Sequence, residues 1–244
     1  MSEGATITLY GFGAKFDLPE ASPFVMKTEL QLKMAGLPYR SERASPREAP
    51  KGKLPFIRDG ARVVGDSTLI RRHLEATRGI DLDAGLGAEE RAAGWAIERM
   101  LEDHLYWAML HLRWADDANF AKGPSQFFAG LGDEVRAAGR ARMIARLEGH
   151  GLGRHGTEEV AALGARSLAA LSAMLGDQPY LFGARISATD AIACAMVASV
   201  ATPFFDGPLT WAARADARLM AYAARMMQRY YPDFALPEGF FPGA

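Results

Sequence analysis

Two hydrophobic periods organise the first part of the chain. Residues 5–10 alternate apolar and polar side chains with the two-residue period of a β-strand, and a loop is expected at 11–21. Apolar side chains then recur at helical spacing, after Ser22 at the N-cap position and Pro23 at the first helical position. We therefore expect a strand, a loop and a helix that ends before Gly36.

A hairpin pattern follows a less regular stretch. A brief second strand is expected at 37–39, and the polar segment 40–50 contains breakers that leave room only for a short, irregular helix. Two β-rich runs, 54–58 and 61–64, then flank an Asp-Gly dipeptide at 59–60. That dipeptide favours the positive φ angles of a tight turn, so the two runs are expected to pair as a hairpin.

The hairpin leads directly into a polar helix start. Asp66 and Ser67 stand where the two-residue period changes to helical spacing, and both are residue types that cap helix N-termini. Backbone N–H groups at such a start suit an anion. Pro55 opens the first hairpin strand and cannot donate a ladder hydrogen bond, so we expect an edge position, a bulge or a cis bond. The helix is expected to end near Gly79.

Everything beyond a linker at 81–87 has the pattern of helices. Long helices are expected at 88–118, 126–149, 158–176 and 211–230. Ser187 and Asp190 have the spacing of a capping box, so Asp190 is expected to be a structural cap. The nearly uncharged run at 192–200 then predicts a helix buried in the centre of this region, and the tail at 232–244 is expected to be a loop.

Composition limits the architecture and the partners. The 244 residues correspond to one or two domains, and we expect an α/β domain at 1–80 and an all-helical domain at 88–244. A net charge of -1 gives no electrostatic reason to expect nucleic acid as a partner. Cys194 is the sole cysteine, which excludes an internal disulfide, and its apolar surroundings predict a small buried residue. We expect a soluble, cytoplasmic protein without a membrane span.

Five motifs in this order resemble the cytosolic glutathione transferases. They are TLYGF in the first strand, SPFVMKTELQLKMAGLPY in the next helix and strand, GKLPFI with its proline, DSTLI at the following helix start and ISATDAIACAMV late in the chain. The phrases APKGKLPFI, ERMLEDHLYW and DQPYLFG are most similar to the failed-axon-connections and metaxin branch and its bacterial relatives. The resemblance implies an α/β plus all-α protein, with a thioredoxin-like N-terminal domain of order βαβαββα before an all-helical C-terminal domain.

The resemblance also implies a glutathione site at the hairpin. The backbone of Leu54, turned outward if Pro55 is cis, pairs with the cysteinyl backbone of the tripeptide. Asp66 and Ser67 suit the ammonium and carboxylate of the γ-glutamyl end, although the family more often has Glu at the first position. Lys53 suits the glycyl carboxylate. Structural alternatives are an edge proline, a capping pair without a ligand and a solvated lysine.

Ser22 stands where the family has its catalytic serine or cysteine. A hydroxyl that donates a hydrogen bond to the sulfur of glutathione, at a helix N-terminus, favours the thiolate over a thiol whose pKa is ordinarily about 8.5. The structural alternative is that Ser22 only caps the helix. Tyr10 is the weaker candidate because it lies within the strand pattern. No metal is expected, since His104 and His111 lack HExxH-like spacing.

The second substrate is expected to contact the long helix at 88–118. By resemblance, its cavity is bordered by Phe12, His104, Tyr106 and Trp107. We expect a glutathione-dependent transferase that conjugates or reductively processes a soft, apolar electrophile, with glutathione as co-substrate. The alternative is a weakly catalytic or non-catalytic binding or interaction protein of the same fold. The long loop at 11–21 and the shortened segment at 40–50 favour this alternative, because both are expected to border the proposed pocket and to narrow it. A homodimer is expected from the resemblance alone.

Overall fold

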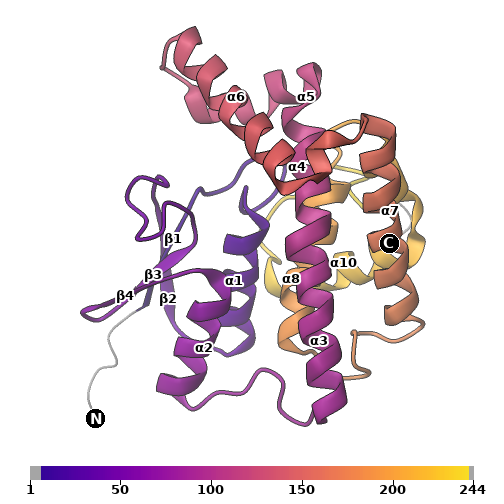
Figure 1. Ribbon diagram of the computed structural model, residues 1–244. Helices are drawn as coiled ribbons and strands as arrows, with labels where there is room; N and C mark the ends of the chain where they lie inside the picture. Colours follow the sequence, from indigo (N-terminus) through magenta and orange to yellow (C-terminus); the bar gives the residue numbers. More distant parts are fainter. Residues whose placement is uncertain (1–6, 242–244) are drawn as a thin grey trace.

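A four-stranded mixed sheet lies beside a larger group of helices (Figure 1). The computed structural model describes residues 7–241. The strands are β1 (Ile7–Gly11), β2 (Tyr39–Arg43), β3 (Phe56–Asp59) and β4 (Arg62–Gly65), in the spatial order β2-β1-β3-β4. β1 runs parallel to β2 and antiparallel to β3, and β3 pairs with β4 as the expected hairpin.

Helices α1 (Pro23–Met34) and α2 (Ser67–Arg78) lie between the sheet and the other helices (Figure 1). Their shared core with the sheet includes Ile7, Leu9, Val25, Leu32, Ile57, Ile70 and Leu74. Each of these side chains is at most 2% exposed, and full burial of such a side chain contributes about 1.5–3 kcal/mol. α1 has Ser22 at its N-cap, and α2 has Asp66, as the sequence predicts.

The segment around β2 differs from the sequence prediction. The strand spans Tyr39–Arg43 instead of 37–39, and all but its first residue are exposed. The predicted helix at 40–50 is wrong: residues after the strand form successive turns, such as the bond from the Glu48 N–H to the Ser45 carbonyl. Prolines in this segment lack the N–H that a helix needs. The order is therefore βαβββα, without the second helix of the expected βαβαββα.

Smaller shifts affect the first strand and the hairpin turn. β1 includes Gly11, whereas the predicted residues 5 and 6 lie outside the described range. Asp59 pairs with Arg62 in the hairpin, so the turn residues are 60–61 and not 59–60. A two-residue loop still places a glycine at positive φ, here 59° at Gly60, because that conformation matches the twist of the strands.

The helical region contains more breaks than its hydrophobic period indicates. Its elements are α3 (Ala88–Met100), η1 (Leu101–Leu105), α4 (Tyr106–Trp114), α5 (Asp117–Lys122), η2 (Pro124–Phe128), α6 (Asp133–His150), η3 (Leu152–Arg154), α7 (Thr157–Leu175), α8 (Ala188–Ala201), α9 (Pro208–Ala215) and α10 (Ala217–Tyr230). The predicted helix at 88–118 is divided because η1 is a π-helical segment. The predicted helix at 211–230 is divided where Asp216 caps α10, its carboxylate accepting from the Leu219 N–H.

α8 forms the centre of the helical region, as its lack of charge predicts. Every residue of α8 is buried, including Cys194, and the helix packs against α1, α9 and α10. The capping box is confirmed, since the Asp190 carboxylate accepts from the Ser187 N–H at 2.7 Å. Asp190 also accepts from the Tyr222 hydroxyl at 3.0 Å, which explains its burial. No helix in residues 7–241 is long and apolar enough to cross a membrane.

Candidate functional site

The hairpin entrance has the geometry of a free main-chain edge. The Leu54–Pro55 peptide bond is cis, one of the three arrangements expected for this proline. The Pro55 carbonyl accepts from the Asp66 N–H at 3.2 Å, which holds the hairpin entrance against the start of α2. The N–H and carbonyl groups of Leu54 form no backbone hydrogen bond within the described residues. An extended peptide has both groups available to it.

Asp66 and Ser67 occupy the start of α2 in different ways. The Asp66 carboxylate accepts from the N–H groups of Thr68 and Leu69, at 3.0 and 3.2 Å, through a single oxygen, Oδ1. Asp66 is exposed and has a φ of 92°, a conformation that residues other than glycine rarely adopt, whereas Ser67 is buried. Asp66 therefore caps the helix, and its second oxygen has no partner within residues 7–241.

Ser22 begins α1 without using its side chain as a cap. Its hydroxyl makes no hydrogen bond to the first turn of α1. The Ser22 N–H donates to Glu20 at 3.1 Å, and Pro23 has no N–H to offer. Among the described residues, no acceptor meets the N–H groups of Phe24 and Val25. The uncommitted donors at this helix start are therefore one hydroxyl and two backbone N–H groups.

Lys27 joins the starts of α1 and α2, a contact that sequence reasoning missed. It lies five residues after Ser22, and its Nζ is 3.5 Å from the hydroxyl of Thr68 in the first turn of α2. The same Nζ donates to Glu98 at 3.0 Å and to Glu102 at 2.6 Å. Lys27 is completely buried, and a lysine in a nearly apolar helix segment is the signal that could have indicated it.

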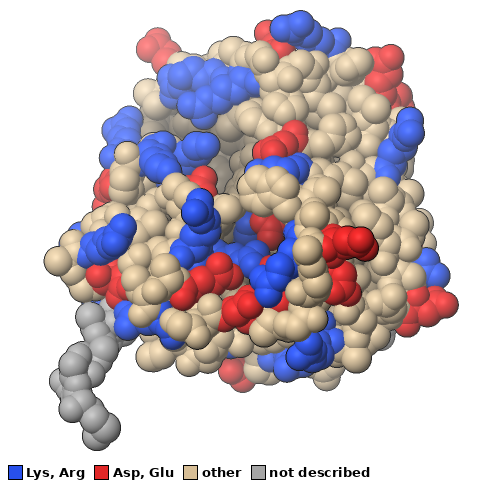
Figure 2. Space-filling model, turned by 60° about the horizontal axis from the view of Figure 1, so that its bottom comes forward, with Lys and Arg blue, Asp and Glu red and all other residues tan. Residues whose placement is uncertain are grey.

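The charges around Lys27 continue to the surface between α2 and α3. Arg71 of α2 bonds to Glu98 of α3 at 3.3 Å and to Asp83 in the connection between these two helices. Arg91 pairs with Asp81 at 2.7 Å nearby. Figure 2 shows acidic and basic side chains interleaved on the face where α2, this connection and α3 meet. The network fixes α2 against the helical region.

Aromatic side chains pack beside the start of α1 and the loop that precedes it. Phe24 packs against Tyr106 with ring centroids 4.7 Å apart, and Tyr106 contacts Trp107 at 5.9 Å. Phe12, in the loop after β1, packs against Phe127 of η2 at 5.3 Å. Three of the four predicted cavity residues therefore belong to aromatic contacts that reach the loop or the start of α1. Phe127, which the sequence did not single out, joins them.

His104 and Tyr10 are directed elsewhere. His104 Nδ1 lies 2.9 Å from the Ser167 hydroxyl on α7, and burial, then the nearby His150, lowers the pKa of its imidazole. Tyr10 stacks on Phe56 of the neighbouring strand, with centroids 4.3 Å apart, as a residue of β1. Both contacts are explained by packing within the fold.

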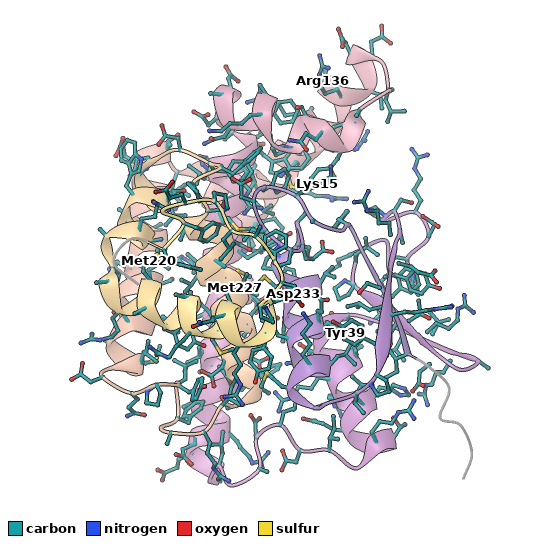
Figure 3. The ribbon with its side chains drawn as sticks, turned by 180° about the vertical axis from the view of Figure 1, so that it is seen from behind. Lys15, Tyr39, Arg136, Met220, Met227 and Asp233 are labelled. Atoms are coloured by element: carbon teal, nitrogen blue, oxygen red, sulfur yellow. The ribbon has the colours of Figure 1, made fainter. Side chains whose placement is uncertain are left out.

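Lys15 connects the loop at 12–21 to the helical region. Its Nζ donates to Gln126 of η2 at 3.4 Å, and Figure 3 shows Lys15 where the loop meets that region. Lys53 is exposed and has no ion-pair partner within residues 7–241. It is free to meet a carboxylate, and it also has the solvation of an ordinary surface lysine. No group of three potential metal ligands occurs in the described part of the chain.

Comparison with known families accounts for this arrangement. Family models described as the glutathione S-transferase N-terminal domain and the glutathione S-transferase C-terminal domain match residues 23–119 and 164–226. The chain is 31% identical over 240 residues to the isoprene-epoxide–glutathione S-transferase of Rhodococcus sp. strain AD45, covering 92% of this chain and 99% of that protein. The chain therefore belongs to the glutathione S-transferase family.

Further similarities define the branch and the fold. The chain is 28% identical over 256 residues to Failed axon connections of Drosophila melanogaster, covering 93% of this chain and 59% of that protein. It is 26% identical over 210 residues to human metaxin-2, covering 83% and 80%. A solved glutathione transferase family member from Pseudomonas fluorescens, with two glutathione bound, has a TM-score of 0.65 at 16% identity, covering 97% of this chain and 96% of that one. The resemblance and the thioredoxin-like plus helical fold are confirmed.

Proposed function

We propose that this protein is a glutathione transferase in which Ser22 stabilises the thiolate of bound glutathione. The observation that carries the proposal is the start of α1, where the Ser22 hydroxyl and the N–H groups of Phe24 and Val25 are uncommitted. A thiolate is stabilised by such donors and by the helix dipole. Lys27 lies between this start and the start of α2, so the parts of the site for the sulfur and for the γ-glutamyl end are held together.

Glutathione binds along the hairpin entrance in this proposal. Leu54, placed by Pro55, offers its main chain to the cysteinyl residue, and the N–H group and hydroxyl of Ser67 receive the γ-glutamyl carboxylate. The free oxygen of Asp66 receives the ammonium group. Lys53 meets the glycyl carboxylate. Glutathione is a co-substrate here, and no residue is assigned to a metal.

The electrophile lies against the aromatic wall of Phe12, Tyr106 and Trp107. We place His104 behind this wall, because its ring is bonded to Ser167 of α7. The name of the Rhodococcus relative favours a small epoxide as the electrophile. The thiolate attacks an epoxide carbon, the carbon–oxygen bond breaks, and the resulting alkoxide takes a proton from water, giving a thioether and a hydroxyl group.

One observation favours a second candidate, a binding protein with little catalysis. The loop at 12–21, which leads directly to Ser22, is attached to η2 by Lys15 and by the contact of Phe12 with Phe127. The similarity to metaxin-2 and Failed axon connections accords with this alternative. In it, glutathione or a related peptide binds, and no electrophile reaches the sulfur.

Measurements of glutathione binding and of catalytic turnover distinguish the transferase from the binding protein. Glutathione at 100 times its dissociation constant stabilises a binding protein by about 2.7 kcal/mol, which a thermal shift detects. Ser22→Ala is expected to keep that shift and to lower kcat with a small epoxide roughly 10- to 100-fold, because only thiol activation is lost. The absence of any shift in the native protein refutes both candidates. A shift without turnover leaves the binding protein.

The remaining proposals concern organisation and assembly. We infer domains at 1–80 and 88–244 with a linker at 81–87, a cytoplasmic location and a homodimer. Val63, Leu69 and Trp95 support the dimer, since these apolar side chains are 40–55% exposed on β4, α2 and α3. Sedimentation of the native protein and of Trp95→Glu tests it: the native chain is expected at twice the mass of the variant.

A further inference from the structure

Glu20 joins the end of β1 to the start of α1. Its carboxylate accepts from the N–H groups of Phe12 at 3.2 Å and Gly13 at 2.9 Å, which directly follow the strand. The same carboxylate accepts from the Ser22 N–H at 3.1 Å, which begins the helix. Glu20 is 4% exposed, so these bonds are shielded from water. A single side chain therefore fixes both ends of the loop that carries it.

The surrounding backbone leaves the carboxylate little freedom. A Cβ atom at Gly11 would lie 2.5 Å from Glu20 Oε2 and 2.7 Å from Val25, so glycine is needed for this approach. The loop is closed by a further bond from the Ala21 N–H to the Gly13 carbonyl at 3.2 Å. Within residues 7–241 the Ser22 hydroxyl has no hydrogen-bond partner to orient it. Its place is consequently set by the backbone that Glu20 holds.

We propose that Glu20 is a positioning residue that places the Ser22 hydroxyl for contact with the sulfur of glutathione. This inference rests on the function proposed above. Glu20 accepts the Ser22 N–H, and Pro23 has no N–H. The backbone donors that stay available to the sulfur are therefore the N–H groups of Phe24 and Val25. A loop acid outside the tripeptide site thus acts on the thiol through Ser22.

The negative charge of Glu20 and its hydrogen bonds to the backbone have opposite effects on the thiolate of bound glutathione. Burial raises the pKa of Glu20 to about 7, and the charged groups that share its cavity of about 210 Å³ are Glu29 of α1 and Glu42 and Arg43 of β2. An ionised Glu20 repels a nearby thiolate, whereas its bonds to the backbone place the hydroxyl that stabilises the thiolate. A substitution that removes the charge of Glu20 and keeps the shape of its side chain therefore shows whether repulsion or placement of the hydroxyl has the larger effect on the thiolate.

Glu20→Gln makes that change. The amide oxygen can keep the bonds from Phe12 and Ser22, which share Oε1, but the NH₂ group then faces the Gly13 N–H. Two donors that face each other push the loop apart, so the backbone that places Ser22 shifts. We expect the pKa of bound glutathione, followed by the ultraviolet absorbance of its thiolate, to rise, and kcat to fall roughly tenfold with little change in KM. Combined with Ser22→Ala, the substitution should not raise the thiol pKa any further, since the placing effect of Glu20 acts through Ser22.

Glu29→Gln is the matched control. Glu29 lines the same cavity, but its carboxylate accepts from the hydroxyls of Tyr39 at 2.7 Å and Tyr231 at 2.8 Å, away from Ser22. This variant should lose stability and leave the thiol pKa unchanged. A thiol pKa that falls or stays constant in Glu20→Gln, or an effect that adds to that of Ser22→Ala, overturns the inference. If Glu20→Gln does not fold, Glu20→Asp, whose shorter arm withdraws the carboxylate, is expected to raise the thiol pKa.

A measurement without glutathione tests the bonds themselves. In the native protein the amide resonances of Phe12, Gly13 and Ser22 should titrate together with the ionisation of Glu20, and in Glu20→Gln this common titration should disappear. Independent titrations refute the inference. If the common titration is seen but the thiol pKa does not respond to Glu20→Gln, positioning fails while the transferase function stands. If the native protein binds no glutathione, the proposed function and the inference fail together.

Discussion

Replacing Lys27 by methionine removes a buried cation that two glutamates share. The Lys27 side chain is 0% exposed, and the side chains of Glu98 and Glu102 are 4% and 6% exposed. Solvent cannot compensate the loss at such sites, and breaking a buried ion pair from one side costs about 3–5 kcal/mol. Glu98 keeps Arg71 as a partner and Glu102 keeps Arg99. The expected loss is therefore near the lower limit, about 3 kcal/mol.

Thermal and urea-induced unfolding measure this loss. A change of 1 kcal/mol shifts Tm by roughly 2–4 °C in a chain of 150–250 residues, so Lys27→Met should unfold roughly 6–12 °C below the native protein. Lys51→Met is the matched control, because Lys51 is exposed and an exposed substitution changes stability by no more than about 0.5 kcal/mol. Changing Glu98 and Glu102 to glutamine together with Lys27→Met should recover most of the loss. A Tm equal to that of Lys51→Met would refute the assigned role.

Three further changes test other parts of the site. Asp66→Ala removes the cap of α2, so it should lower the free energy of urea-induced unfolding by about 1 kcal/mol and weaken glutathione binding in calorimetry. Asp66→Asn should keep the cap and weaken only glutathione binding. Because burial raises the pKa of Glu20 from 4.5 to about 7, its protonated form favours the fold. The stabilisation is complete below pH 4.5 and is lost as the pH rises through 7, by about 3 kcal/mol, and Glu20→Gln should abolish this dependence. Gly11→Ala should destabilise the chain by about 1–3 kcal/mol by overpacking against Glu20 and Val25, and an equal Tm would contradict the close approach.

Features that depend on neighbouring residues in the chain were predictable from the sequence. The start of α1 at Ser22, the cap at Asp66, the hairpin and the capping box at Ser187 follow from local backbone requirements, although the Ser22 hydroxyl itself makes no capping bond. α8 was also predictable, because a helix without charge must be buried. These elements, together with the motifs, were sufficient to identify the family.

Features that depend on distant partners were not predictable. β2 is polar and exposed because it is an edge strand whose register is set by bonds to β1, so no hydrophobic pattern reveals it. The helical period continues through η1, which conceals the change to π-helix there. The burial of Glu20 depends on how its loop folds back onto Phe12 and Gly13, which no periodic pattern indicates. Lys27 is an unusual residue for its helix position, but its partners Glu98 and Glu102 lie 71 and 75 residues away, so the sequence does not identify them.

The loop at 12–21 limits how new substrate preferences can evolve. In the proposed function it carries both Phe12, which borders the electrophile, and Glu20, which accepts the Ser22 N–H. A mutation in this loop that admits a different electrophile will therefore also disturb activation of the thiol. Changes at Phe127 or Trp107, which lie on η2 and α4, leave the bonds of Glu20 untouched. Directed evolution toward new acceptors should consequently accumulate its successful substitutions on those two elements and spare the loop.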